Sequence, residues 1–185
     1  MRAPRPVDRV KTDGTQFEWK GQVMAKAAKA VKHPRSGTRQ LIDDMLMQRT
    51  RMLKLLCELS QQDLKQEQAD DAVRETLDDF LTVLVDYIAA GHFGLYERIA
   101  MGSERRAPVV KTAREIYPRI ADTTVAAVEF NERYGSADAP TRAQRLARDL
   151  STLGEEVTTR IELEDRLIHA MLGTEYAIPQ AATAH

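Results

Sequence analysis

Apolar residues recur at steps of three and four along most of the chain after residue 36, which is the spacing of one face of an α-helix. The Ser36-Gly37-Thr38 cap signal predicts a first helix that runs to about Gln61. Its apolar face consists of Ile42, Met45, Leu46, Met52, Leu53, Leu56 and Leu59. The polar run QQDLKQEQADD then predicts a connection.

Three further helices follow from the same spacing. The second is predicted over about residues 72–101, with a core face of Leu77, Leu81, Leu84, Ile88, Gly91 and Leu95. The third begins near Pro108, which suits a first helical turn, and reaches about Tyr134. Pro140 opens the fourth, which ends at Gly173 and has a core face of Leu146, Leu150, Leu153, Val157, Ile161, Ile168 and Met171.

Four long amphipathic helices joined by short turns favour one fold class. Each apolar face needs a partner, and short connections place consecutive helices side by side. We therefore expect an all-α protein, an antiparallel up-and-down four-helix bundle. The bundle domain is predicted over residues 36–173, after a basic extension at residues 1–35 and before an untethered C-terminal tail at residues 174–185.

The charge is divided unevenly between the head and the body of the chain. Residues 1–40 hold ten Lys or Arg and three Asp or Glu; of the 27 basic and 28 acidic residues, 17 and 25 remain for residues 41–185. The head is thus net +7 and the body net -8. Within the head, residues 16–32 could form a short basic helix. Such a head could contact nucleic acid or a membrane surface, or be a solvated extension without a partner.

The residues that usually carry catalysis or bind metals form no recognisable motif. No His stands three residues after a Glu, as a dimetal bundle site requires, and four His with one Cys are too scattered for a zinc site. Phosphate-binding glycine motifs are absent. Asp165 and His169, four residues apart, are best explained as a surface pair. We predict no catalytic residue, no cofactor and no metal.

The compartment also follows from composition. The lone Cys57 excludes an internal disulfide, and no apolar run approaches the ~20 residues of a membrane span. The start of the chain also lacks the pattern of a secretory signal. A reducing cytoplasm is the expected location, without membrane attachment.

The second helix has a second face that its core stripe does not explain. Helical angles place Asp79, Asp86, Ala90, Phe93 and Glu97 opposite the leucine stripe. An aromatic ringed by carboxylates is typical of an interface anchor. Alternatively, Phe93 packs under the basic head or in a second groove of the bundle. The glycines at 91 and 94 suggest a close approach or a local bend, because each weakens a helix.

Glu164 interrupts the apolar stripe of the fourth helix. A charge at that position must be paired or lie at the edge of the core, because burial without a partner is expensive. Arg160, four residues earlier, is a candidate partner. We expect Glu164 to reach solvent at the rim of the bundle.

Four segments resemble one known family of transcription regulators. The run LDDFLTVLVDYIAAGHFGLYERI at residues 77–99 closely resembles the signature helix of the regulator of sigma D family, the anti-sigma proteins Rsd and AlgQ. The runs RQLIDDMLMQR at 39–49, REIYPRI at 114–120 and LSTLGEEVTTRIELEDRLI at 150–168 are similar to their other helices. The resemblance spans residues 36–172.

The resemblance implies a partner and a binding surface. Proteins of this family are helical bundles that bind region 4 of the housekeeping sigma factor of RNA polymerase, which favours alternative sigma factors. The matching residues imply contact roles for Asp86 and Phe93 within VDYIAAGHF, and further roles at Asp79, Ala90, His92, Tyr96, Glu97, Glu164 and Asp165. The alternative is a nucleic-acid-associated regulator that uses the basic head, but we expect no direct nucleic-acid binding.

Overall fold

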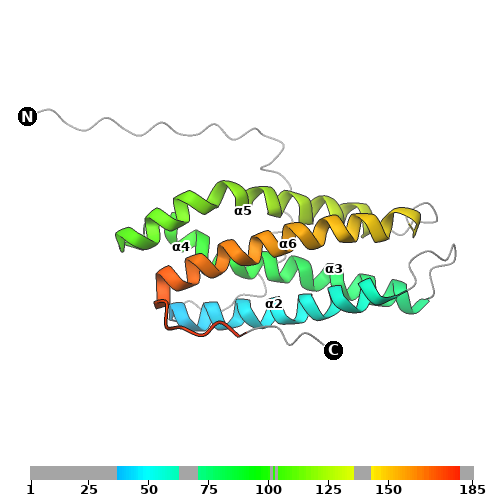
Figure 1. Ribbon diagram of the computed structural model, residues 1–185, viewed down its shortest axis with the longest axis horizontal. Coiled ribbons are helices and arrows are strands. Elements are labelled where there is room, and N and C mark those ends of the chain that lie inside the picture. The colour runs from blue at the N-terminus through cyan, green and yellow to red at the C-terminus, as the bar shows by residue number, and fades with distance from the viewer. Residues whose placement is uncertain (1–36, 63–70, 101, 103, 136–142, 180–185) are drawn as a thin grey trace, which may run out of the picture. The chain divides into compact units, whose positions relative to one another are not determined.

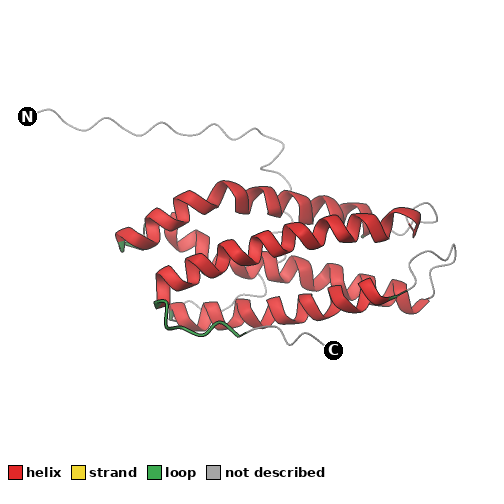
Figure 2. Cartoon of the chain, viewed as in Figure 1, coloured by secondary structure: helices red, strands yellow, loops and turns green. Residues whose placement is uncertain are grey.

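Within the part of the chain that it describes, the computed structural model contains four long helices and no strand (Figures 1 and 2). It describes residues 37–62, 71–100, 102, 104–135 and 143–179, with the backbone alone at 93, 94, 97, 98, 143 and 144. The long helices are α2 (Thr38–Gln61), α3 (Asp71–Gly91), α5 (Ala107–Tyr134) and α6 (Ala143–Leu172). The predicted all-α class is confirmed, whereas the predicted basic extension at 1–35 lies outside the described residues.

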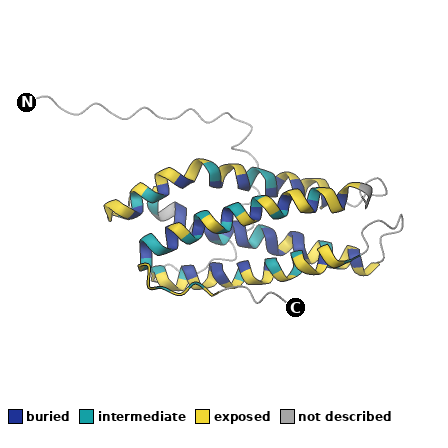
Figure 3. Ribbon diagram, viewed as in Figure 1, coloured by how far each residue is buried: buried dark blue, intermediate teal, exposed yellow. Residues whose placement is uncertain are grey.

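The four long helices pack as a bundle around one apolar core. Helix α2 packs mainly against α3, and α5 mainly against α6, while contacts between α3 and α5 and between α2 and α6 join the two pairs. Figure 3 shows buried residues on the faces that the helices turn toward one another, with exposed residues outside. The buried cluster takes residues from every one of these helices.

The predicted core faces are largely confirmed. All seven stripe residues of α2 belong to the core or pack against it, and Leu81, Leu84, Ile88 and Leu95 are buried. In α6 the stripe is buried except for Ile161, which is partly exposed. Spacing alone therefore identified which side of α2, α3 and α6 faces inward, since apolar burial is the main stabilising contribution to such a bundle.

The second helix, predicted over about residues 72–101, is confirmed as a helical segment at residues 71–100, but it is not α-helical throughout. Helix α3 ends at Gly91, a single π-helical turn follows at His92–Tyr96 (η1), and a short α4 completes the segment at Glu97–Ala100. A π-turn contains one residue more than an α-turn, so every residue after it is rotated relative to a regular helix. A rotation of 100° per residue therefore cannot be used to assign residues after His92 to one face of the helix.

The C-terminal segment is also attached more firmly than expected. The Tyr176 hydroxyl donates a hydrogen bond to Asp43 of α2 at 3.0 Å, and its ring lies 5.6 Å from the Arg39 guanidinium carbon. Tyr176 and Ile178 both pack against the core cluster. The prediction of an untethered tail was therefore wrong for residues 174–179, and residues 180–185 lie outside the described part.

Two glycines of the α6 region predict opposite effects of the same substitution. Gly173, directly after the helix, has φ of 95°, a conformation that an L-residue adopts only with strain, whereas Gly154 lies inside α6 with open space around it. We expect Gly173→Ala to lower the free energy of unfolding by about 1–2 kcal/mol. Gly154→Ala should raise it by about 1 kcal/mol, because alanine is the better helix former. Urea denaturation of both variants checks this, and an equal sign for the two would contradict it.

Candidate functional site

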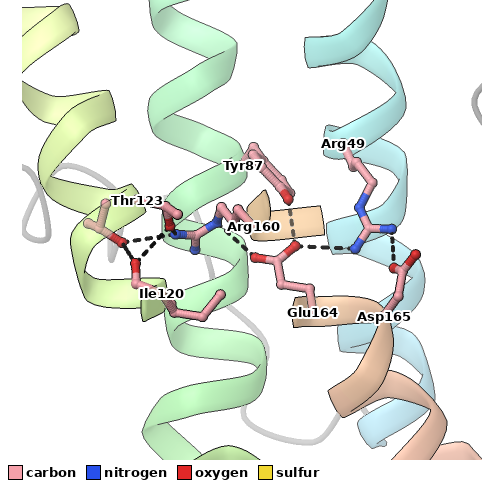
Figure 4. Close-up of polar contacts among 8 residues, drawn as sticks. Arg49, Tyr87, Ile120, Thr123, Arg160, Glu164 and Asp165 are labelled. Carbon is pink, nitrogen blue, oxygen red and sulfur yellow. Dashed lines mark hydrogen bonds and ion pairs between the residues drawn. The ribbon is translucent and has the colours of Figure 1, made fainter. Parts of the chain in front are cut away.

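A buried carboxylate, that of Glu164, lies at the centre of the polar interior of the bundle (Figure 4). Tyr87 of α3 donates a hydrogen bond to Glu164 Oε2 at 2.5 Å, and Arg49 Nη2 of α2 donates to the same oxygen at 3.2 Å. The other oxygen, Oε1, lies 2.8 Å from Arg160 Nε, one turn earlier on α6. The prediction that Glu164 reaches solvent at the rim was wrong, while Arg160 as its partner is confirmed.

Each arginine also has a partner beyond Glu164. Arg49 Nη1 donates to Asp165 Oδ1 at 2.5 Å, and Arg160 Nη1 donates to the hydroxyls of Thr123 at 3.3 Å and Thr124 at 2.9 Å. Both hydroxyls in turn donate to the carbonyl oxygen of Ile120 on α5. Asp165 therefore pairs with Arg49, and the two arginines balance the charges of two carboxylates.

We call Arg49, Tyr87, Arg160, Glu164 and Asp165 the ionic cluster. Its electrostatics favour the charged arginines and the neutral tyrosine. Burial raises the pKa of the Tyr87 hydroxyl, and the neighbouring Glu164 charge raises it further. Burial would lower the pKa of both guanidiniums, but the surrounding groups, Glu164 among them, outweigh burial and raise it. Because an arginine stays charged even in the interior, its burial is offset by a nearby carboxylate such as Glu164.

Gly91 lies directly against the ionic cluster. A Cβ atom at this position would come within 3.1 Å of Glu164 Oε1 and 3.2 Å of Arg160 Nη2. Both separations are tighter than most side chains tolerate. The sequence-based expectation of a close approach at this glycine is confirmed, and the neighbour is α6.

The predicted second face of α3 is described only in part. Asp79 is exposed, and Asp86, Ala90 and His92 are half-buried. The side chains of Phe93 and Glu97 lie outside the described part, so neither interpretation of Phe93 is tested. The carboxylates at 79 and 86 do lie away from the leucine stripe.

The structure corrects the assignment of two other residues as surface contacts. Tyr96 is 3% exposed and Glu164 is 0% exposed, so neither side chain offers a surface to a partner. Tyr96, the last residue of the π-turn, is turned inward, and its ring meets that of Tyr117 edge-on with the centroids 6.0 Å apart. Asp165 keeps 32% of its side chain exposed while bound to Arg49.

Sequence reasoning missed Arg49 and Tyr87. A usable signal existed for Arg49, which follows Met45 by four residues and precedes Met52 by three, and so stands in the apolar stripe of α2. A second charge interrupting a core stripe, besides Glu164, points to a buried pair. Tyr87 gave no comparable signal, since tyrosine is common at partly buried positions.

The described residues contain neither a metal-binding cluster nor a membrane-spanning helix. No group of three or more His, Cys, Asp or Glu there could hold a metal ion. No described helix combines the length and apolar character needed to cross a membrane.

The fold and the site define a helical-bundle protein whose charged cluster joins the helices in the interior. The chain belongs to the Rsd/AlgQ family, described as "Regulator of RNA polymerase sigma(70) subunit, Rsd/AlgQ", which matches residues 24–172. As a member of this family, it regulates the sigma(70) subunit of RNA polymerase and thereby transcription.

Similar proteins carry the same description. The chain is 31% identical over 137 residues to the "Regulator of sigma D" of Yersinia pseudotuberculosis serotype O:1b, covering 71% of this chain and 79% of that protein. It is 30% identical over 137 residues to that of Yersinia enterocolitica, with 71% and 80% covered. The protein of Salmonella arizonae is 35% identical over 95 residues, or 51% and 58%. No solved structure matches significantly.

Proposed function

We propose that this protein is an anti-sigma factor that binds region 4 of the housekeeping sigma factor and blocks its access to the promoter. Sequestering that factor favours alternative sigma factors in the competition for core polymerase. Membership of the Rsd/AlgQ family carries this proposal, because the match includes the whole of α3 and η1. A role inside the cell, in the cytoplasm, belongs to the same proposal.

The charge of the body supports such a partner. Region 4 reads promoter DNA, and a DNA-reading surface is basic because it neutralises phosphates. Residues 41–185 hold 25 acidic and 17 basic groups. Opposite charges speed encounter and make the association sensitive to salt. An acidic body can therefore occupy the surface that would otherwise bind the promoter.

The proposed contact surface is the second face of α3 together with the turn that follows it. In this proposal Asp86 pairs with a basic group of region 4, and Phe93 fills an apolar pocket beside it. The surrounding contacts are Asp79, Ala90, His92, Glu97 and Asp165. The exposure of Asp79 and the partial exposure of Asp86 are compatible with this surface.

Calorimetry with isolated sigma region 4 tests the proposal. Phe93→Ala should weaken binding by about 30-fold or more, as removal of a central aromatic anchor does. Asp86→Ala should weaken binding and reduce its salt dependence, whereas the matched control Asp122→Ala, an exposed carboxylate on α5, should do neither. Wild-type affinity in both variants would exclude this surface.

Deletion of residues 1–35 separates the proposal from the alternative of nucleic-acid binding by the head. The shortened protein should bind region 4 as the full chain does. If the deletion instead abolishes both the binding to region 4 and the retention of the protein on a DNA column, the head is the functional part.

We also propose the antiparallel up-and-down order for the bundle. Two hydrogen bonds between neighbouring helix ends support it: Gln62 to Thr76 at 3.3 Å and Tyr134 to Asp149 at 2.8 Å. Spin labels at residues 61 and 71 should lie close together. A separation near the length of a helix, about 30 Å, would contradict this order.

A further inference from the structure

We propose that the Arg160–Glu164 pair is a positioning element, which holds the π-turn η1 and thereby sets where the following residues meet sigma region 4. The inference rests on the proposed function for its partner, but its structural part concerns this chain alone. Neither Arg160 nor Glu164 touches the partner in this proposal. Their effect passes through the backbone at Gly91.

The contact at Gly91 is the first observation. The ion pair of α6 lies where a side chain of α3 would otherwise stand, within 3.1 Å of an ideal Cβ. Both charged groups are almost fully buried, at 2% exposure for Arg160 and 0% for Glu164. Because Arg160 is also tied to the two threonines of α5, the pair has little freedom to withdraw.

The position of the π-turn is the second observation. The α-helix ends at Gly91, the residue in contact with the ion pair, and the wider turn begins at the next residue. Single π-turns inside helices are rare and need a local cause. Close packing of a charged pair against the glycine backbone supplies one.

Two tyrosines anchor the segment on either side of the turn. Tyr87, before it, is bound to Glu164, while Tyr96, at its end, is buried against Tyr117. The Tyr96 hydroxyl is buried without a hydrogen-bond partner among the described residues. A buried polar atom without a hydrogen bond costs free energy. The packing of neighbouring residues, rather than the local sequence, therefore holds this segment in its conformation.

Amide hydrogen exchange and binding together test the proposal. Gly91→Ala and Glu164→Gln should raise the exchange rates of amides 92–97 at least tenfold relative to those at the centre of α5. Both variants should also weaken binding to region 4 at least tenfold. Gly91→Ala provides the test if Glu164→Gln fails to fold, because alanine removes no buried partner.

The control is Leu150→Ala, on the same helix and about 21 Å from Glu164 along its axis. Leu150 is buried in the core, so this variant is destabilised without a change near η1. It should leave the affinity and the relative exchange of amides 92–97 unchanged. Equal effects from Leu150→Ala, or unchanged exchange in Gly91→Ala, would overturn the positioning role.

The hydrogen-exchange measurement tests the role of the ion pair separately from the proposed binding to sigma region 4. If the wild-type protein does not bind region 4, the proposed function fails. Faster exchange at 92–97 in the two variants would still support the hold of the ion pair on the turn, and unchanged exchange would overturn it independently of any partner.

Discussion

Replacing Glu164 with alanine is expected to lower the free energy of unfolding by about 3–5 kcal/mol, the cost of leaving a buried charge without its partner. The substitution removes the carboxylate that faces both Arg49 and Arg160, which are 4% and 2% exposed. It also leaves the Tyr87 hydroxyl without its acceptor. Urea denaturation followed by circular dichroism measures the loss, which extends to complete unfolding if the wild-type protein is marginal.

Glu156→Ala is the matched control for this prediction. Glu156 lies on the same helix and pairs with Arg119 at 2.7 Å, but the two side chains are 25% and 41% exposed. Partly exposed pairs contribute only about 0–1 kcal/mol. If Glu156→Ala and Glu164→Ala lower the stability equally, burial does not explain the large cost of removing Glu164.

Phe80→Ala is expected to cost about 3–5 kcal/mol, through lost burial and the cavity that remains. Phe80 is fully buried in α3, and its ring meets that of Phe130 in α5 edge-on, with centroids 6.1 Å apart. This aromatic contact joins the α2–α3 pair to the α5–α6 pair. The midpoint of urea denaturation should fall accordingly.

Phe80→Leu distinguishes the packing of this site from a general effect of substitution. Leucine fills most of the same volume, so its cost should be well below that of alanine. Met47→Ala, at a side chain that is 62% exposed, should change stability by less than about 0.5 kcal/mol. Equal losses at Phe80 and Met47 would contradict the placement of Phe80 in the core.

The sequence predicted those parts of the fold that depend on periodicity. Helix α2 ends at Gln61, where the polar run begins, and α6 ends at Leu172, just before the stop signal Gly173. The second boundary follows from local chemistry, since Gly173 has a positive φ of 95° that ends a helix within a few residues. The inward faces follow from burial of apolar groups, which repeats regularly along each helix.

The parts that depend on contacts between distant residues could not be predicted in the same way. The π-turn arises where α3 meets α6; the glycines at 91 and 94 indicated a close approach or a bend, but the periodicity of residues 77–99 does not show that a π-turn forms there. Arg49 is separated from Glu164 by 115 positions, so their pairing has no local spacing to detect. Tyr176 binds Asp43 across 133 positions, and a short segment after a helix carries too little pattern to reveal such a contact.

The ionic cluster has a consequence for how the bundle unfolds. Arg49, Tyr87 and Glu164 come from α2, α3 and α6, and Arg160 ties α6 to the threonines of α5. Any helix that detached alone would strand a charge or a polar group in the remaining core. Partial opening is therefore penalised, and the described helices should melt in one cooperative transition, with the same midpoint by far-UV circular dichroism and by the near-UV signal of the buried tyrosines.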